Sequence, residues 1–210
     1  MTPRPDPTRY PIPPGKYVHG TALVVSLVML LAVLLLSMSM ANRALTDEKA
    51  ARNQQERLVA LHAAESALLD AESDIENART SGSRSAIFSS QSAIGFTDGC
   101  GKGDANPYQG LCLDHGNGPA ATWRQVDLGN TGTHSASVRF GHFTGRSLPV
   151  GGTTLPGQSP RYIIELLPDN EPGQTAWPAY IYRITAIGFG TTTQTQAVVQ
   201  SLYRKAGNGE

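Results

Sequence analysis

The longest stretch of this chain without a helix-breaking residue constrains most strongly how the chain can fold. No glycine occurs between Gly20 and Gly82, and no proline occurs between Pro14 and Pro107, although the remainder is rich in both. Residues 43–79 are dominated by alanine, leucine, glutamate, glutamine and arginine, which are strong helix formers. We therefore predict one helix over residues 21–79, about 90 Å long at ~1.5 Å per residue.

The first part of this predicted helix has the length of a membrane span. Residues 21–41 are uncharged and mostly apolar, and as a helix they would extend about 31 Å, the thickness of a bilayer core. A secretory signal peptide is the alternative, but its apolar region is usually about 7–15 residues long and ends at a cleavage site. The longer run, continuing as helix, favours a retained anchor. Residues 1–20 hold three basic residues and one acid, so the positive-inside rule places them in the cytoplasm and everything after residue 41 in a bacterial periplasm.

The second part of the helix is amphipathic. Leu58, Leu61, Leu68 and Ile75 stand at spacings of three and seven, which predicts one apolar stripe covered by a folded domain. Residues 65–76 contain five acids and no base. A solvated face is the ordinary interpretation of such a run; contact with basic residues of neighbouring subunits is the alternative.

After residue 79 the composition changes to that of a small domain. Residues 80–85 form a polar Gly/Ser linker that should end the helix, and residues 95–118 hold seven glycines and indicate a loop. Strand patterns follow at 136–143, 161–167, 179–189 and 195–204, with connections short enough for an antiparallel meander. The predicted fold is therefore α+β, with the amphipathic half of a long helix packed on a small antiparallel sheet. It comprises a loop-rich part, 80–135, and a strand part, 136–205.

The two cysteines, Cys100 and Cys112, both lie in the predicted exported part, where a disulfide can form. Together with His115 they match none of the usual zinc-site spacings, so we expect a disulfide and no metal. A disulfide that closes a loop of this size should add roughly 3 kcal/mol to the free energy of unfolding in the chain-entropy model. Calcium binding stays an alternative, because four oxygen-bearing side chains cluster in the same loop: Asp98, Asp104, Asn106 and Asp114. Their spacing is not that of an EF-hand.

Composition and motifs do not indicate an enzyme or a nucleic-acid-binding protein. The 17 Lys and Arg residues balance 17 Asp and Glu residues, whereas a nucleic-acid binder shows a basic excess. Neither a G-x-S-x-G elbow nor an H-E-x-x-H motif occurs. We interpret His62 as a surface or subunit-contact residue, and His134 and His142 as structural. We therefore predict a non-catalytic protein without a cofactor.

Four segments together resemble a known family: "GTALVVSLVMLL" from residue 20, "LHAAESALLDAE" at 61–72, "YRITAIGFG" at 182–190 and "AVVQSLYR" at 197–204. In this order they are similar to the PilX-like minor pilins of type IV pilus assembly. The resemblance implies a leader peptide at 1–20, a membrane half of the helix at 21–41, a periplasmic half at 42–79 and a globular pilin head at 80–210. It also implies cleavage by the prepilin peptidase between Gly20 and Thr21, with methylation of the new N-terminus at Thr21.

Two positions depart from the pilin pattern. Most pilins have a bulky apolar residue where this chain has Thr21, and a glutamate where it has Val25. In the family that carboxylate is thought to pair with the charged N-terminus of a neighbouring subunit. A minor pseudopilin at the tip of type II secretion fibres also lacks it. By analogy, the resemblance implies a place at the top of the fibre.

The function implied by the resemblance is participation in pilus assembly, in a priming and tip complex that supports adhesion and twitching motility. The implied partners are other minor pilins and the major pilin through the N-terminal helix, the prepilin peptidase and a large tip adhesin. The implied location is the inner membrane, with the head in the periplasm, and the pilus tip after assembly. Two alternatives stay open: a minor pseudopilin of a type II secretion system, and a signal-anchored periplasmic binding protein.

Overall fold

The computed structural model describes residues 20–76, 84–88, 92–114, 121–169 and 179–205. The chain divides into two compact units, Met1–Ala50 and Ala51–Glu210. The long helix α1 (Thr21–Glu76) contributes residues to both. It begins where the sequence predicts; its predicted end at residue 79, the first four residues of the predicted linker and residues 1–19 of the predicted leader lie outside the described part.

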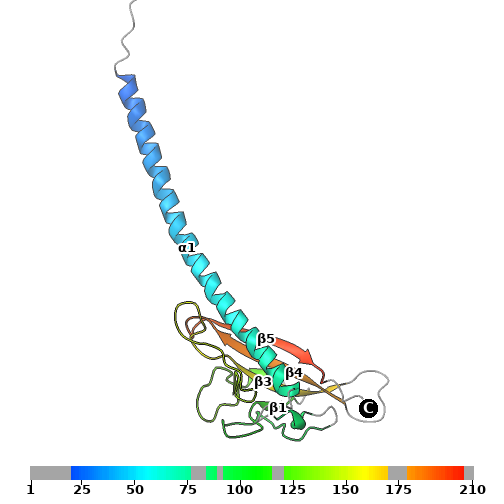
Figure 1. The fold of residues 1–210 in the computed structure, drawn as a ribbon. Helices are drawn as coiled ribbons and strands as arrows, with labels where there is room; N and C mark the ends of the chain where they lie inside the picture. Colours follow the sequence, from blue (N-terminus) through cyan, green and yellow to red (C-terminus); the bar gives the residue numbers. More distant parts are fainter. Residues whose placement is uncertain (1–19, 77–83, 89–91, 115–120, 170–178, 206–210) are drawn as a thin grey trace, which may run out of the picture. The chain divides into compact units, whose positions relative to one another are not determined.

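The second unit is built on a five-stranded sheet, labelled in Figure 1. The strands are β1 (Leu111–Leu113), β2 (Val138–Arg139), β3 (Arg161–Asp169), β4 (Ala179–Phe189) and β5 (Gln196–Tyr203). Their order is β1-β3-β4-β5, and β2 pairs with β3 beside β1. Two short 3-10 helices, η1 (Ser85–Ile87) and η2 (Thr122–Arg124), lie in the connections.

The predicted α+β fold is confirmed, and the sheet is mixed rather than wholly antiparallel. Strands β3, β4 and β5 form the predicted antiparallel meander. Strand β1, in a segment predicted as loop, runs parallel to β3 with Leu111 opposite Ile164. Its three residues are too few to show a period of two.

The predicted strand at 136–143 is shorter than expected, since only Val138 and Arg139 pair with β3. Gly141 explains the early end. Its φ is +78°, and a Cβ there would overlap the carbonyl group of Arg146. The chain therefore turns at a position that favours glycine.

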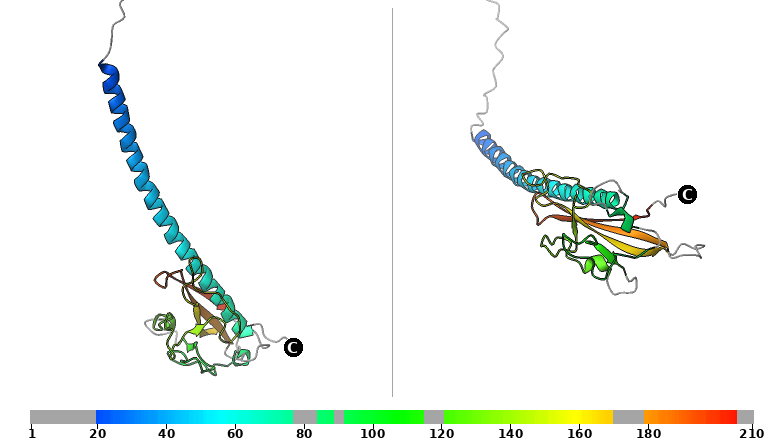
Figure 2. Two further views of the ribbon diagram at one scale, coloured as in Figure 1. Left: turned by 60° about the vertical axis from the view of Figure 1, so that its left-hand side comes forward. Right: turned by 60° about the horizontal axis from the view of Figure 1, so that its bottom comes forward.

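Residues 51–76 of α1, the sheet and a layer of loops form three layers, seen edge-on in the right view of Figure 2. Strand side chains alternate between the two interfaces. Tyr162, Ile164 and Tyr182 belong to the cluster that α1 covers, together with Ala67, Ala71 and Ile75. Ile163, Ile187 and Phe189 point the other way, into a second cluster with Cys100, Cys112 and Leu128.

The face of α1 that packs on the sheet is not the predicted leucine stripe. It consists of small residues, with five alanines at most 3 % exposed: Ala60, Ala63, Ala64, Ala67 and Ala71. Of the predicted stripe, Ile75 is buried, Leu58 is 47 % exposed and Leu61 and Leu68 are half-buried. The reason is volume, because the facing strands already supply large side chains such as Tyr162 and Tyr182, and close packing then requires small residues on the helix.

Candidate functional site

The first unit presents an apolar helix that nothing in the described chain covers. Thr21–Met38 is the one candidate membrane span among the described residues, with a mean hydropathy of 2.7 and none of it buried. Leu23 and Met38 are 69 % and 70 % exposed. Its serine hydroxyls donate within the helix, Ser26 Oγ to Leu23 O at 2.9 Å and Ser37 Oγ to Val33 O at 2.8 Å. Such a surface needs lipid or other helices around it.

Three residues singled out by the sequence lie together at the start of this helix. Gly20 is an exposed turn residue, Thr21 is the first residue of α1, and Val25 is 58 % exposed one turn later. The chain has no carboxylate from Thr21 until Asp47. The beginning of α1 therefore offers no acidic side chain to an amine.

In the second unit, α1 makes backbone-to-backbone contact with the sheet at Gly188 of β4. A Cβ atom at this glycine would overlap Ala60 O and Ala64 N. Small residues on both sides therefore let the two backbones approach closely, a use of glycine typical of strands that meet another backbone.

The end of α1 is joined to the rest of the head by a buried ion pair. Arg84 Nη2 lies 2.7 Å from Asp74 Oδ2, and both side chains are at most 2 % exposed. The same guanidinium donates to the carbonyl oxygens of Pro107 and Gln109 at 3.0 and 2.6 Å, and Tyr162 Oη donates to Asp74 Oδ2 at 2.9 Å. Burial, followed by the charge of Asp74, raises the pKa of Tyr162 well above its usual range, so the phenol stays a donor.

A second acid on the helix, Asp70, is also buried inside the head. It accepts from Thr144 Oγ1 at 2.5 Å and from Gly141 N at 2.7 Å. Burial raises the pKa of this carboxyl, and the two hydrogen bonds oppose the rise. The expected solvated face is therefore wrong for Asp70 and Asp74, while Glu65 and Glu76 are exposed. Asp70 and Asp74 are buried in the head because they lie on the alanine face of α1, whereas Glu65 and Glu76 bond His62 and Tyr203 as exposed residues.

The turn between β4 and β5 is attached to α1 through Glu56. Its carboxylate accepts from Thr191 Oγ1 and, at 3.3 Å, from Thr192 N. The hydrogen bond from Thr191 lowers the pKa of Glu56. Glu56, Asp70 and Asp74 thus hold α1 at three points along the head.

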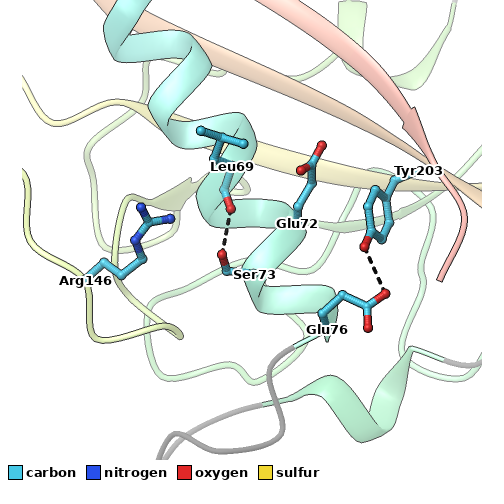
Figure 3. Close-up of a pocket in the computed structure, with 6 residues that line it drawn as sticks. All are labelled: Leu69, Glu72, Ser73, Glu76, Arg146 and Tyr203. Atoms are coloured by element: carbon cyan, nitrogen blue, oxygen red, sulfur yellow. Dashed lines mark hydrogen bonds between the residues drawn. The ribbon is translucent and has the colours of Figure 1, made fainter. Parts of the chain in front are cut away.

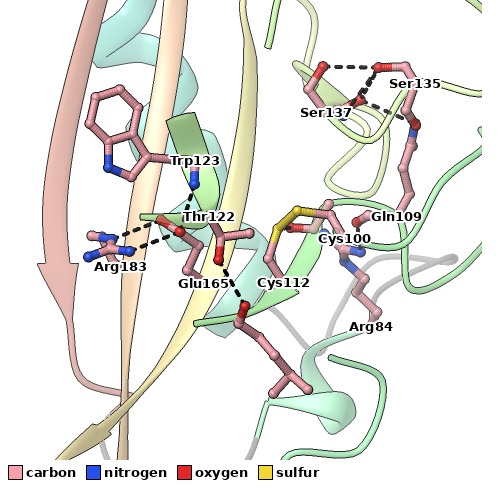
Figure 4. Close-up of a disulfide and its surroundings, with 12 residues drawn as sticks. Arg84, Cys100, Gln109, Cys112, Thr122, Trp123, Ser135, Ser137, Glu165 and Arg183 are labelled. Atoms are coloured by element: carbon pink, nitrogen blue, oxygen red, sulfur yellow. Dashed lines mark hydrogen bonds and ion pairs between the residues drawn. A yellow bond between two sulfur atoms is a disulfide. The ribbon is translucent and has the colours of Figure 1, made fainter. Parts of the chain in front are cut away.

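On the opposite side of the sheet, a disulfide joins Cys100 to Cys112 beneath the loop layer (Figure 4). The two cysteines are 4 % and 0 % exposed. Cys112 lies in β1, whereas Cys100 has a φ of 66° in a tight turn. The bond therefore fastens the glycine-rich loop to the mixed part of the sheet.

The oxygen-bearing side chains of this loop do not converge on a cation site. Asp114 pairs with Arg183 at 2.8 Å, and Asp104 accepts from Gln109 Nε2 at 3.0 Å. Arg183 also bonds Glu165, whose other contact is the backbone N–H of Trp123 at 3.0 Å. In the described ranges, no group of three or more His, Cys, Asp or Glu side chains is placed to hold a metal ion. His115 lies outside those ranges.

Removing the disulfide should lower the stability of the head. We expect the double variant Cys100→Ala/Cys112→Ala to lose about 3 kcal/mol of unfolding free energy, because the unfolded chain regains the freedom of the loop. Urea unfolding of the full chain in detergent, followed by tryptophan fluorescence, measures the loss. Dithiothreitol should destabilise the parent protein to a similar extent and leave the variant unchanged; equal stability of parent and variant would contradict the prediction.

The residues that sequence reasoning missed are Arg84, Gly188 and the inward-facing Asp70 and Asp74. Gly188 carried a usable signal, since a glycine inside a strand often marks close approach of another backbone. Asp70 and Asp74 stand four apart beside Ala67 and Ala71, so they share the alanine face. Arg84 gave no signal, because its partners lie 10 to 25 residues away and no local pattern joins them.

An exposed apolar helix that continues into the layer covering a small mixed sheet defines a protein of the pilin-like class. The family model for the PilX N-terminal segment matches residues 19–69. The model for the C-terminal part of type IV pilus assembly protein PilX matches residues 108–205. The two models together cover well over half of the chain, which therefore belongs to the PilX family of type IV pilus assembly proteins. No curated protein and no solved structure matches the chain significantly.

Proposed function

We propose that this chain is a minor pilin that helps to start pilus fibres and stays at their tip, without catalytic activity. The observation that carries the proposal is the uncharged, uncovered span Thr21–Met38 at the start of a helix that ends in a folded head. A helix of this kind can exchange lipid contacts for contacts with similar helices at little cost, since both surroundings are apolar. It therefore suits a subunit that leaves the membrane to enter a fibre.

The proposed maturation follows from the boundary at Gly20. The leader, residues 1–20, would lie in the cytoplasm and be removed by the prepilin peptidase, leaving Thr21 as the N-terminus, open to methylation. The basic residues of the leader support this orientation in the inner membrane. The head, residues 80–210, and the periplasmic half of the helix, residues 42–79, would then lie in the periplasm, where the Cys100–Cys112 disulfide can persist.

The proposed position at the tip rests on Val25. A carboxylate buried among apolar helices is costly unless it is paired, so a subunit keeps one there only if a neighbour supplies the cation. Val25 cannot accept the N-terminal amine of a subunit stacked on it, and this chain would therefore cap the fibre. Its partners below would be other minor pilins and the major pilin, and a large adhesin could be carried above to support adhesion and twitching motility.

Intact-mass analysis and a deletion strain test this proposal together. The membrane-bound protein should lack residues 1–20, and cells without the chain should carry far fewer surface fibres and lose twitching. Gold labels on the head should mark one end of each fibre. A product that begins at Met1 would indicate a signal-anchored binding protein, and a deletion that impairs secretion but not fibre number would indicate a type II pseudopilin. Labels spaced along the shaft would contradict the tip position.

A further inference from the structure

Strand β5 leaves one edge of the sheet open. It pairs with β4 through eight consecutive residue pairs, from Tyr182–Tyr203 to Phe189–Gln196, and is last in the strand order. Along its other side the described chain places no strand. No backbone hydrogen bond from the described turns and loops reaches residues 196–203 either. A row of backbone donors and acceptors is therefore available for a further strand.

This edge lacks the features that usually prevent strand addition. Natural edge strands are shortened, bulged, or protected by lysine, charged side chains or proline. Residues 196–203, "QAVVQSLY", contain no charge, proline or glycine, and their pairing with β4 runs without a bulge. An unprotected edge of this length on an exported protein indicates that a strand covers it in the assembled state.

The two sides of β5 define the chemistry of that strand. Away from α1, Val198 and Leu202 are 46 % and 67 % exposed, which favours apolar side chains on the added strand. On the side of α1, Tyr203 Oη donates to Glu76 at 2.9 Å, and Glu72 lies beside them (Figure 3). Burial, followed by the bond to Glu76, raises the pKa of Tyr203 to about 12. Arg146 also lines this pocket, but Glu72 and Glu76 lie nearer Tyr203 in Figure 3, so the helix side next to β5 favours basic side chains.

A second copy of this chain does not fit the edge as a symmetric antiparallel pair. An antiparallel β5–β5 pair has a two-fold axis perpendicular to the sheet, and this axis reverses every direction in the sheet plane. Residues 51–76 of α1 lie across the face of the sheet (Figure 2), so the helices of the two copies would run in opposite directions. Subunits of one fibre share a direction, so a symmetric antiparallel β5–β5 pair does not suit them.

We propose that β5 accepts a β strand from a different subunit of the pilus assembly, with apolar side chains beside Val198 and Leu202 and a basic side chain toward Glu72. The inference rests on the proposed function, because the partner is a subunit of the same fibre. Strand addition supplies main-chain hydrogen bonds for affinity and alternate side chains for specificity. It would fix the order of heads at the tip independently of the packing of the apolar helices.

A lysine on β5 should block this addition without unfolding the head. Leu202→Lys in the full-length chain is expected to reduce surface fibres at least tenfold, since a lysine on an edge strand opposes the pairing of a further strand. Val198→Lys repeats the test at a second position, in case one variant folds poorly. The matched control is Ile94→Lys, which changes an isoleucine that is 74 % exposed outside the sheet; it should leave fibre number unchanged. All three purified variants should keep the parent Tm.

Photocross-linking identifies what covers the edge. Benzoylphenylalanine at residue 202, in cells that make fibres, should link to a strand of another pilus subunit, identified by peptide mass spectrometry; the same probe at residue 94 should not. Normal fibre number in both lysine variants, or a cross-link to a second copy or to a helix, would overturn the proposal. The deletion strain separates the two hypotheses: few fibres after deletion but normal fibres with Leu202→Lys would contradict strand addition and leave the proposed function intact.

Discussion

Replacing Arg84 by methionine should destabilise the head by about 3–5 kcal/mol, the usual cost of removing one partner of a buried ion pair. Asp74 is buried, and Arg84 is its only cationic partner in the described chain. Without the guanidinium, the carboxylate would keep only the hydroxyl of Tyr162 as a donor. The carbonyl oxygens of Pro107 and Gln109 would lose a donor as well. Urea unfolding of the full chain in detergent measures the loss.

Two controls separate the charge effect from simple loss of packing. Arg146→Met removes an arginine that is 47 % exposed and 4.0 Å from Asp70. We therefore expect the free energy of unfolding to fall by at most about 1 kcal/mol. The double variant Arg84→Met/Asp74→Leu removes both buried charges. It should lose less stability than Arg84→Met alone, because no unpaired charge remains. A double variant as unstable as Arg84→Met would show that packing, and not the buried charge, dominates.

Gly188→Val should separate α1 from the sheet. We expect the free energy of unfolding to fall by about 3 kcal/mol, the upper end of the usual destabilisation by overpacking. The added atoms would overlap Ala60 O and Ala64 N. These are backbone atoms of a helix, which cannot rotate away as a side chain can. We expect limited proteolysis to cut the head of the variant rapidly and its Tm to fall.

Gly129→Ala is the matched control for this variant. A Cβ at Gly129 would lie 3.6 Å from Asp127 Oδ1 and 3.8 Å from Phe189 Cζ, which are ordinary contacts. Its stability should stay within about 0.5 kcal/mol of the parent. Normal proteolytic resistance of Gly188→Val would mean that α1 can move off the sheet without loss of the head.

The elements that the sequence predicts well are those with long periodic patterns. The uniform helix of residues 21–76 and the long strands β3, β4 and β5 each repeat their signal over eight residues or more. Strand β1 and the truncated β2 are too short to show a pattern, and their existence depends on β3 being next to them. Parallel pairing in particular cannot be found in local sequence, because it joins segments that are distant along the chain.

The packed face of α1 was predicted wrongly for a similar reason. Hydrophobicity alone predicts that leucines such as Leu58 face the sheet. Alanines face it instead, because the sheet already supplies large side chains and leaves little space. Likewise, the acids of residues 65–76 look alike in sequence, and it is the head that buries Asp70 and Asp74 and leaves Glu65 and Glu76 exposed. In the region of Gly20, Thr21 and Val25, by contrast, the pattern is local, and its role as a cleavage site stays a prediction.

The attachments of α1 to the head, at Glu56, Asp70, Asp74 and Glu76, have a consequence for how such a subunit could leave the membrane. Each is made within one polypeptide, so none has to be broken when the surroundings of the span change from lipid to protein. The folded portion can then stay unaltered during the change, and only the contacts of lipid with roughly twenty apolar residues have to be replaced.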